Sequence, residues 1–291
     1  MSPSFKGIGC MCLGVLFLAL GDAVSKWLGE THSPVQIIFF RTLVSLPLIA
    51  VLAHFSGGLI KLRTRRPGVH LVRGLIYTGT MGCFVLGLTL LPLAEATAIA
   101  FVAPLFVTLL SVPLLGERID APVLAASLLG FAGVLVVVRP GGDAFDPGAL
   151  VLLGAAVFYA LLMITARRYG KHEHLWAMVF YMTLVPLVIS AALLPWVWQA
   201  PHPWHWPGFL LSGVLGIGAT AFITLAFRYA PAAIAAPFDY TAMLWAVLLG
   251  WWFWGEMPDA WVWVGSTLII GSGLAIAYHD RRTTLKRRPT A

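Results

Sequence analysis

The sequence predicts an all-α integral membrane protein in which ten transmembrane helices form two inverted five-helix repeats. The first observation behind this prediction is composition. Hydrophobic residues make up 59% of the 291 residues and charged residues 11%, whereas about a quarter of an ordinary soluble domain is charged. The second observation is a series of ten apolar runs, and the third is an internal repeat that contains five of these runs in each copy.

The ten apolar runs are each about 20 residues long, which lets a helix cross the roughly 30 Å hydrocarbon core of a bilayer. In chain order we expect spans at residues 5–28, 34–55, 71–91, 94–115, 120–138, 147–167, 174–194, 208–229, 232–254 and 259–278. The first run follows Lys6, as in a signal peptide. It lacks a small-residue cleavage site and continues through Asp22 and Lys26, so we expect it to be a span.

The connections between spans carry turn-forming or basic residues. Residues 61–70, between the second and third spans, are rich in arginine, and we expect a solvated, lipid-facing connector without a site. The sequence Arg-Pro-Gly-Gly at 139–142 breaks the helix between the two halves. Glycines in the third and eighth spans let neighbouring membrane helices approach closely, or leave room for a cavity beside Tyr77.

Two copies of one pattern define the internal repeat. Residues 92–117 (PLAEATAIAFVAPLFVTLLSVPLLGE) correspond to residues 231–256 (PAAIAAPFDYTAMLWAVLLGWWFWGE), an offset of 139 residues. Both copies begin with proline, hold a second proline and one carboxylate, run through apolar positions and end in Gly-Glu. We therefore expect a first repeat at 1–140, with spans 1–5, and a second at 141–291, with spans 6–10 and a short basic tail.

An odd number of spans per repeat gives the two copies opposite orientations in the membrane. Lysine and arginine collect in cytoplasmic loops. With the N-terminus inside, sixteen of the nineteen fall on the cytoplasmic side, Arg139 falls outside, and Lys26 and Arg41 lie within spans. We expect a multi-pass protein of a bacterial-type cytoplasmic (inner) membrane with both termini in the cytoplasm.

The net charge of +7 then reflects this orientation and the proximity of the basic loops to anionic lipid. Nucleic-acid binding is not expected, because the basic residues are scattered over short loops.

Three ionisable residues lie within the first two spans. Asp22 and Lys26 are four residues apart and share one face of a helix, and Arg41 follows in the second span. Ionisable groups inside the hydrocarbon are unfavourable and usually face a cavity or a partner. Three alternatives remain open: a structural network of Asp22 with Lys26 or Arg41, contact with a charged part of the substrate, or snorkelling to the outer surface.

Each copy of the repeated stretch carries one carboxylate. Asp239 follows Pro237 in the ninth span, at a depth where a carboxylate is suited to proton exchange. We expect Asp239 to take up and release a proton during transport; direct contact with the substrate and a purely structural hydrogen bond are the alternatives. Glu95, its near counterpart in the first repeat, is expected closer to the outer surface.

Four tyrosines offer aromatic faces with polar tips to a cavity: Tyr77, Tyr159, Tyr181 and Tyr240. Lys26 and Arg41 approach from the first half and Asp239 from the second, so we expect a cavity that is bipolar along the membrane normal. This polarity favours a zwitterion. A carboxylate could meet Arg41 with two hydrogen bonds, and an amino or sulfonium group could lie near Asp239 or over a tyrosine ring.

Enzyme and metal motifs are missing from the sequence. No HExxH, CxxC, nucleophile elbow or phosphate-binding glycine loop occurs, so we expect neither an enzyme nor an ATP-driven pump, and no cofactor or metal. Cys10, Cys12 and Cys83 fall inside predicted spans and imply no disulfide framework.

Several stretches resemble the EamA-type members of the drug/metabolite transporter superfamily. They are GDAVSKWLG, IIFFRTLVSLPL, RPGVHLVRGLIY, LPLAEATAIAFVAPLFVTLLSVPLLGER and GFAGVLVVVRP. The resemblance covers essentially the whole chain, with two EamA-like repeats. Asp22, Ser25 and Lys26, with Phe40-Arg41 and the segment 66–74, further resemble the branch that includes S-adenosylmethionine uptake carriers. Other members export amino acids, opine-type metallophores and other metabolites.

The resemblance implies a central cavity between spans 1–4 and 6–9. Spans 5 and 10 would then be peripheral, where a homodimer could form. The second half departs from the first, because Met163 and Met182 stand where the first half has Asp22 and Arg41. A symmetric, two-ended site is therefore not expected.

These observations together predict a secondary active transporter that works by alternating access around a site near the midplane. We expect the cargo to be a small polar, amino-acid-derived zwitterion, the coupling ion to be a proton, and the direction to be export, which is commoner in the family. Uptake of S-adenosylmethionine-like compounds and flipping of a lipid-linked intermediate are the alternatives. The candidate residues for substrate binding or coupling are Asp22, Lys26, Arg41, Tyr77, Glu95, Tyr159, Tyr181, Asp239 and Tyr240.

Overall fold

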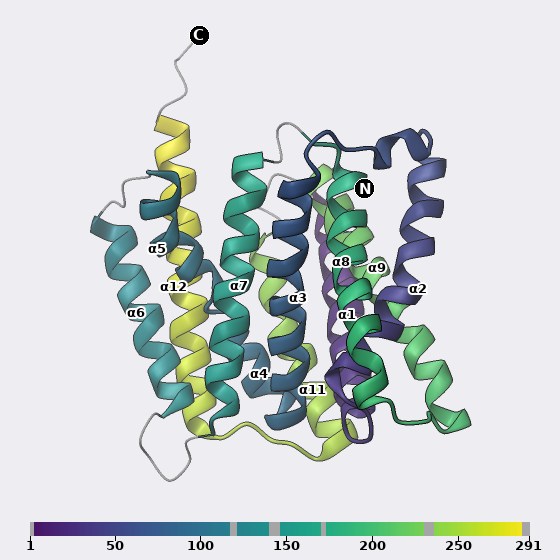
Figure 1. Cartoon of the computed structure of the whole chain (residues 1–291). Coiled ribbons are helices and arrows are strands. Elements are labelled where there is room, and N and C mark those ends of the chain that lie inside the picture. The colour runs from purple at the N-terminus through teal and green to yellow at the C-terminus, as the bar shows by residue number, and fades with distance from the viewer. Residues whose placement is uncertain (1–2, 117–120, 140–145, 170–172, 230–235, 287–291) are drawn as a thin grey trace.

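The computed structural model describes residues 3–116, 121–139, 146–169, 173–229 and 236–286. All regular elements in these ranges are helical, and they stand side by side as one bundle (Figure 1). Eight helical stretches within the described residues are long and apolar enough to cross a membrane, and a shorter apolar stretch covers Ala260–Ala275. The predicted all-helical membrane fold is confirmed.

The described residues of the first half form six α-helices and one short 3₁₀ helix. They are α1 (Pro3–Gly29), α2 (Pro34–Phe55), η1 (Leu59–Leu62), α3 (Pro67–Leu90), α4 (Leu93–Ala100), α5 (Ala103–Leu115) and α6 (Ala121–Val138). Proline in the first turn favours the starts of α2 and α3, since the N–H that proline lacks has no helical partner there. Ser33 caps α2 by accepting a hydrogen bond from the Gln36 N–H.

The second half repeats this order in its described residues. It contains α7 (Gly148–Tyr169), α8 (Leu175–Val197), η2 (Pro203–His205), α9 (Trp206–Tyr229), η3 (Ala236–Tyr240), α11 (Thr241–Trp254) and α12 (Ala260–Lys286). Residues 230–235, where the expected ninth span begins, lie outside the described residues.

The expected fourth span is interrupted near its middle. Helix α4 ends at Ala100 and α5 begins at Ala103, because Pro104 has no N–H to donate to the Ala100 carbonyl. In the equivalent stretch of the second half, Pro237 lies in η3, which passes into α11. In both copies of the repeat a new α-helix therefore begins near the second proline, α5 at Ala103 and α11 at Thr241.

Helix pairing across the two halves follows the symmetry of inverted repeats. Helix α1 packs on α9 and α3 packs on α7, so the first and third spans of the first half contact the third and first spans of the second. The remaining spans pair with their own counterparts: α2 with α8, α4 with α11 and α6 with α12. Exchanging the halves leaves this set of contacts unchanged, as a pseudo-two-fold axis in the membrane plane requires.

Helices α6 and α12 contact each other through glycine. A Cβ atom at Gly133 would lie 2.8 Å from the Gly265 carbonyl oxygen, and one at Gly265 would lie 2.6 Å from the Gly133 carbonyl oxygen. The two backbones therefore meet at a distance that no larger residue allows, which is a common way for membrane helices to associate.

The bundle has two ends, which we name by their connections. The terminal face carries the start of α1, the end of α12 and the α2–α3 connection at residues 56–66 (Figure 1). The opposite face carries the α1–α2 connection at residues 30–33, the junction of α3 with α4, and the α11–α12 connection. The sequence predicts that the terminal face is cytoplasmic.

This orientation can be tested with single cysteines in a chain whose Cys10, Cys12 and Cys83 have been replaced by alanine. We expect Ser56→Cys, on the terminal face, to be protected from a membrane-impermeant thiol reagent in intact cells. Met257→Cys, whose native side chain is 70% exposed on the opposite face, should be labelled from outside. Both positions should react after the cells are opened. Labelling of Ser56→Cys in intact cells would reverse the predicted orientation.

Candidate functional site

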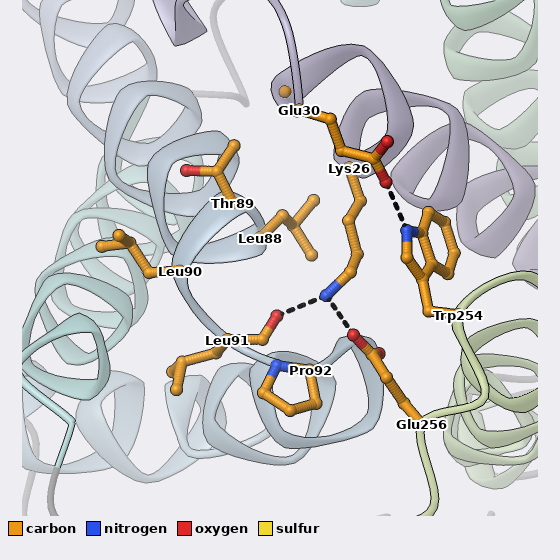
Figure 2. A pocket seen from close by; sticks show the side chains of 10 residues that line it. Lys26, Glu30, Leu88, Thr89, Leu90, Leu91, Pro92, Trp254 and Glu256 are labelled. Atoms are coloured by element: carbon orange, nitrogen blue, oxygen red, sulfur yellow. Dashed lines mark hydrogen bonds and ion pairs between the residues drawn. The ribbon is translucent and has the colours of Figure 1, made fainter.

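Lys26 lies in the last turn of α1, at the opposite face, and its ammonium group is fully engaged there (Figure 2). Its Nζ donates a hydrogen bond to the Leu91 carbonyl at 2.7 Å and lies 2.8 Å from Oε1 of Glu256. Leu91 follows the end of α3, so its carbonyl has no partner in that helix. Lys26 thereby joins α1 both to the α3–α4 junction and to the second repeat.

The other oxygen of the Glu256 carboxylate forms a second contact with the first repeat. Oε2 accepts a hydrogen bond of 2.9 Å from the Leu93 N–H, at the first residue of α4. A carboxylate is favoured there, because the free N–H groups of a helix start carry partial positive charge. Gly255, in the left-handed region at φ 68°, ends α11 and turns the chain so that Glu256 reaches α4.

Trp254 completes this group of residues, which we call the Lys26 cluster: Lys26, Glu30, Leu91, Trp254 and Glu256. The Trp254 indole N–H donates a 2.6 Å hydrogen bond to Glu30 Oε1, and Lys26 Nζ lies 5.4 Å from the Trp254 ring centroid, within cation–π distance. The cluster borders a pocket of about 300 Å³ between the ends of α1, α3 and α11 (Figure 2).

Asp22 and Arg41 lie apart from the Lys26 cluster, and among the described residues no ion pair at contact distance joins them. Asp22 is 8% exposed on α1, and its carboxylate is within electrostatic reach of the Arg41 guanidinium on α2. Arg41 also lies against α9, since a Cβ at Gly216 would be 3.2 Å from its Nη2. Of the predicted pairings, Asp22 therefore interacts with Arg41, while Lys26 turns to Glu256.

Tyr159 lies within electrostatic reach of two other candidate residues, each on a different element. Tyr159 on α7 is within electrostatic reach of Asp239 on η3 and of Tyr77 on α3. Its side chain is 44% exposed and that of Asp239 is exposed as well, although both lie within the predicted spans. Two hydroxyl groups and a carboxylate from both repeats thus share one region of the bundle.

Tyr240 and Glu95 have other neighbours. The Tyr240 ring contacts Phe101 at 5.2 Å, and its hydroxyl lies against Gly273 of α12, where a Cβ would collide with it. Glu95 lies in the first turn of α4, half-buried and within electrostatic reach of Glu256 and of Asp259. The structure therefore places Glu95 at the opposite face, near the Lys26 cluster and away from the Tyr159 region.

Tyr181 lies at the terminal face, in a group of residues that sequence reasoning missed. Its ring is 5.0 Å from that of His70, whose Nε2 lies 3.1 Å from Glu173 Oε2. The Thr64 hydroxyl donates to the same oxygen at 2.9 Å. The hydrogen bond from His70, aided by that from Thr64, lowers the pKa of Glu173 below its ordinary value.

Arg73 makes a second connection between the halves near the terminal face. Its Nη1 on α3 donates to the Thr165 hydroxyl at 3.0 Å and to the Leu162 carbonyl at 3.3 Å, both on α7. No signal in the sequence pointed to this contact or to His70 and Glu173. Glu256 could have been found, because each copy of the repeat ends in Gly-Glu. Among the described residues, no three His, Cys, Asp or Glu side chains gather as a metal site.

The two roles of Glu256 can be separated by mutation. Glu256→Gln keeps an oxygen for the Leu93 N–H but removes the ion pair, whereas Glu256→Ala removes both contacts. We expect Glu256→Gln to lower the free energy of unfolding by roughly 2 kcal/mol, because it leaves the mostly buried Lys26 ammonium without its counter-charge. Glu256→Ala should lower it further. The measurement is denaturant unfolding of the protein in detergent.

A matched control is Asp259→Asn. The Arg139–Asp259 ion pair, 2.7 Å long, is 30% and 42% exposed and lies at the same face. Solvent screening limits an exposed pair to less than about 1 kcal/mol, and asparagine keeps an acceptor for the Val262 N–H. Equal destabilisation by Glu256→Gln and Asp259→Asn would contradict a special role for the Lys26–Glu256 pair.

Comparisons with known proteins agree with this architecture. The EamA-like transporter family matches residues 5–139 and 146–278. The chain is 29% identical over 277 residues to a Rickettsia conorii protein named S-adenosylmethionine uptake transporter, covering 95% of this chain and 94% of that protein. It is 29% identical over 274 residues to the pseudopaline exporter CntI of Pseudomonas aeruginosa, covering 94% and 96%. It is 31% identical over 295 residues to a riboflavin transporter of Rhizobium johnstonii, covering 98% and 96%.

A solved structure shares the fold. A crystal structure with 23% sequence identity superimposes with a TM-score of 0.64, covering 97% of this chain and 98% of the other. The two matched segments correspond to the two sets of spans, and relatives aligned over nearly their whole length are transporters. The chain belongs to the EamA-like transporter family, and it is a multi-pass membrane transporter.

Proposed function

We propose that this transporter carries a small polar, amino-acid-derived zwitterion across the cytoplasmic membrane by alternating access. The observation that carries the proposal is the separation of opposite charges within the bundle. Arg41 and Asp22 lie in the first repeat, and Asp239 lies on η3 of the second repeat, within electrostatic reach of Tyr159. An apolar cargo would leave the Asp239 carboxylate and the remaining hydrogen-bond donors of Arg41 without partners as the site closes, whereas a zwitterion offers a charge to each.

Arg41 is the proposed partner of the cargo carboxylate. Its guanidinium can form two parallel hydrogen bonds with a carboxylate, a geometry that lysine cannot supply. Asp22 is within electrostatic reach of the guanidinium but makes no ion pair with it at contact distance among the described residues. Arg41 therefore keeps hydrogen-bonding capacity for a ligand.

The Lys26 cluster is the proposed closure at the outer end. It connects α1 and the α3–α4 junction of the first repeat to Glu256 of the second. If the two repeats rock against each other, these contacts must break before the opposite face can open. The contacts of His70 and Arg73 join the repeats at the terminal face in the same conformation, and they would have to break when that face opens.

Export coupled to protons is the proposed direction and energy source. Similarity to the pseudopaline exporter supports export. The similarity to S-adenosylmethionine uptake transporters supports a second candidate, the uptake of a sulfonium-bearing zwitterion, for which the same charges would serve. Flux measured in both directions across proteoliposomes of known orientation distinguishes the two.

The zwitterion proposal can be tested through ligand-induced stabilisation. The unfolding temperature of the purified protein is measured with a panel of amino-acid derivatives, including S-adenosylmethionine. We expect at least one acid to raise it, because a ligand that binds only the folded state stabilises that state. The carboxamide of that compound should have no effect.

Arg41→Lys should lose this stabilisation. We expect its affinity for the acid to fall by on the order of tenfold, because lysine cannot form the two parallel hydrogen bonds that the arginine guanidinium forms with a carboxylate. Arg168→Lys, an exposed position at the end of α7, is the matched control and should behave as wild type. If acid and amide stabilise the wild type equally, Arg41 does not bind the carboxylate.

Proton coupling is assigned to Asp239. No cation lies within ion-pair distance of its carboxylate among the described residues, so a proton is the available counter-charge inside the membrane-spanning region. We expect transport by Asp239→Asn in proteoliposomes to become insensitive to an imposed pH gradient while downhill exchange of cargo continues. Asp259→Asn, at the opposite face, should keep the normal response. A normal response in Asp239→Asn would exclude the coupling role.

A further inference from the structure

The α2–α3 connection presents apolar side chains beside basic ones at the terminal face. Phe55, at the end of α2, is 82% exposed, and Leu59 and Ile60 on η1 are 54% and 72% exposed. Lys61 follows them directly. A short helix with apolar residues next to basic ones is suited to the boundary between acyl chains and headgroups.

A polar pocket lies next along the same connection. It has a volume of about 390 Å³ and is lined by Arg63, Arg65, Arg66, Glu173 and His174. The Glu173 carboxylate already accepts hydrogen bonds from Thr64 and His70. The three guanidinium groups therefore have only one nearby carboxylate, and no ion pair links them to any described acid.

The backbone around the pocket adds to its positive potential. Arg66 precedes α3 as its N-cap residue and makes no side-chain cap to the helix. The N-terminal end of α3, with its partial positive charge, thus starts at the wall of the pocket. The Arg66 N–H donates to the Thr64 hydroxyl, which in turn donates to Glu173. This chain of hydrogen bonds fixes the arginine-bearing segment against the second repeat.

We propose that this pocket binds the phosphate of an anionic phospholipid, whose acyl chains lie along Phe55, Leu59 and Ile60. The charge of the pocket requires an anion, and the exposed apolar residues that precede it in the chain favour a lipid over a soluble phosphate. Basic pockets near the cytoplasmic boundary of membrane proteins recognise such headgroups. The connector that the sequence analysis expected to be without a site becomes a lipid site.

A lipid bound there would contact both repeats. Arg63, Arg65 and Arg66 belong to the first half, whereas Glu173 and His174 belong to the second. The same Glu173 holds His70 of α3. Anionic lipid would therefore stabilise the conformation in which the terminal face is closed by these contacts.

The proposal is tested by native mass spectrometry of the purified full chain with dioleoyl phosphatidylglycerol and, separately, dioleoyl phosphatidylcholine. We expect phosphatidylglycerol to bind preferentially, and Arg63→Gln/Arg66→Gln to weaken its binding by on the order of tenfold, since each basic residue near a headgroup contributes to the attraction. Arg63→Lys/Arg66→Lys should keep most of the binding, and this variant serves if the glutamine variant fails to fold.

The matched control is Lys6→Gln/Arg168→Gln, which removes two exposed charges at the same face but outside the pocket. It should bind phosphatidylglycerol as wild type does. Equal losses in the control and in the pocket variant would overturn the proposal in favour of general surface charge.

A second arm separates lipid from soluble anion. Leu59→Ser/Ile60→Ser should weaken phosphatidylglycerol binding while leaving any binding of glycerol phosphate unchanged. If glycerol phosphate displaces the lipid completely and the serine variant binds lipid normally, the pocket is a soluble-anion site and the lipid proposal is wrong.

Discussion

The Glu256 carboxylate is the contact on which the arrangement of the opposite face depends. One oxygen neutralises Lys26 of α1, and the other caps α4 at Leu93. A buried lysine near the membrane boundary is tolerable only with such a partner, and the start of α4 needs an acceptor for its free N–H groups. One side chain from the second repeat thus provides both the counter-charge for Lys26 and the cap of α4 in the first repeat. A transporter that opens at this face must replace both contacts, which makes Glu256 a structural residue and a candidate for control of opening.

The inverted repeat imposes a second constraint. A helix in lipid has to satisfy its backbone hydrogen bonds internally, yet Pro104 and Pro237 interrupt the ladder within the fourth and ninth spans. Such breaks persist in membrane proteins where protein or a water-filled cavity surrounds them. Here η3 carries Asp239, which is within electrostatic reach of Tyr159 on α7. An interrupted span and polar residues thus coincide in the second half, which supports the proposal that the cargo binds there.

The two halves share a backbone plan but divide the chemistry between them. Asp22 and Arg41 have methionines at the corresponding positions of the second half. The first repeat therefore supplies the guanidinium of Arg41, and the second repeat supplies the carboxylate of Asp239. Identical sites related by the pseudo-two-fold axis would present the same charge at both ends. This division makes the two halves chemically unequal, which supports the proposed bipolar cargo. The relatives that move S-adenosylmethionine, pseudopaline or riboflavin show that the same plan accommodates different cargoes.

The sequence was sufficient for the fold because its signals are local. Apolar runs of membrane-spanning length and an odd number per repeat predicted the bundle, and the second span was placed at 34–55, where α2 lies. The break after Ala100 was missed, since the apolar pattern continues through it.

At the site, spacing predicted that Asp22 and Lys26 share a helix face. Only the tertiary structure decided their partners, because these depend on which distant helix packs against that face. Lys26 forms an ion pair with Glu256, and Asp22 is within electrostatic reach of Arg41. The Tyr181 ring contacts His70 at the other end of the bundle.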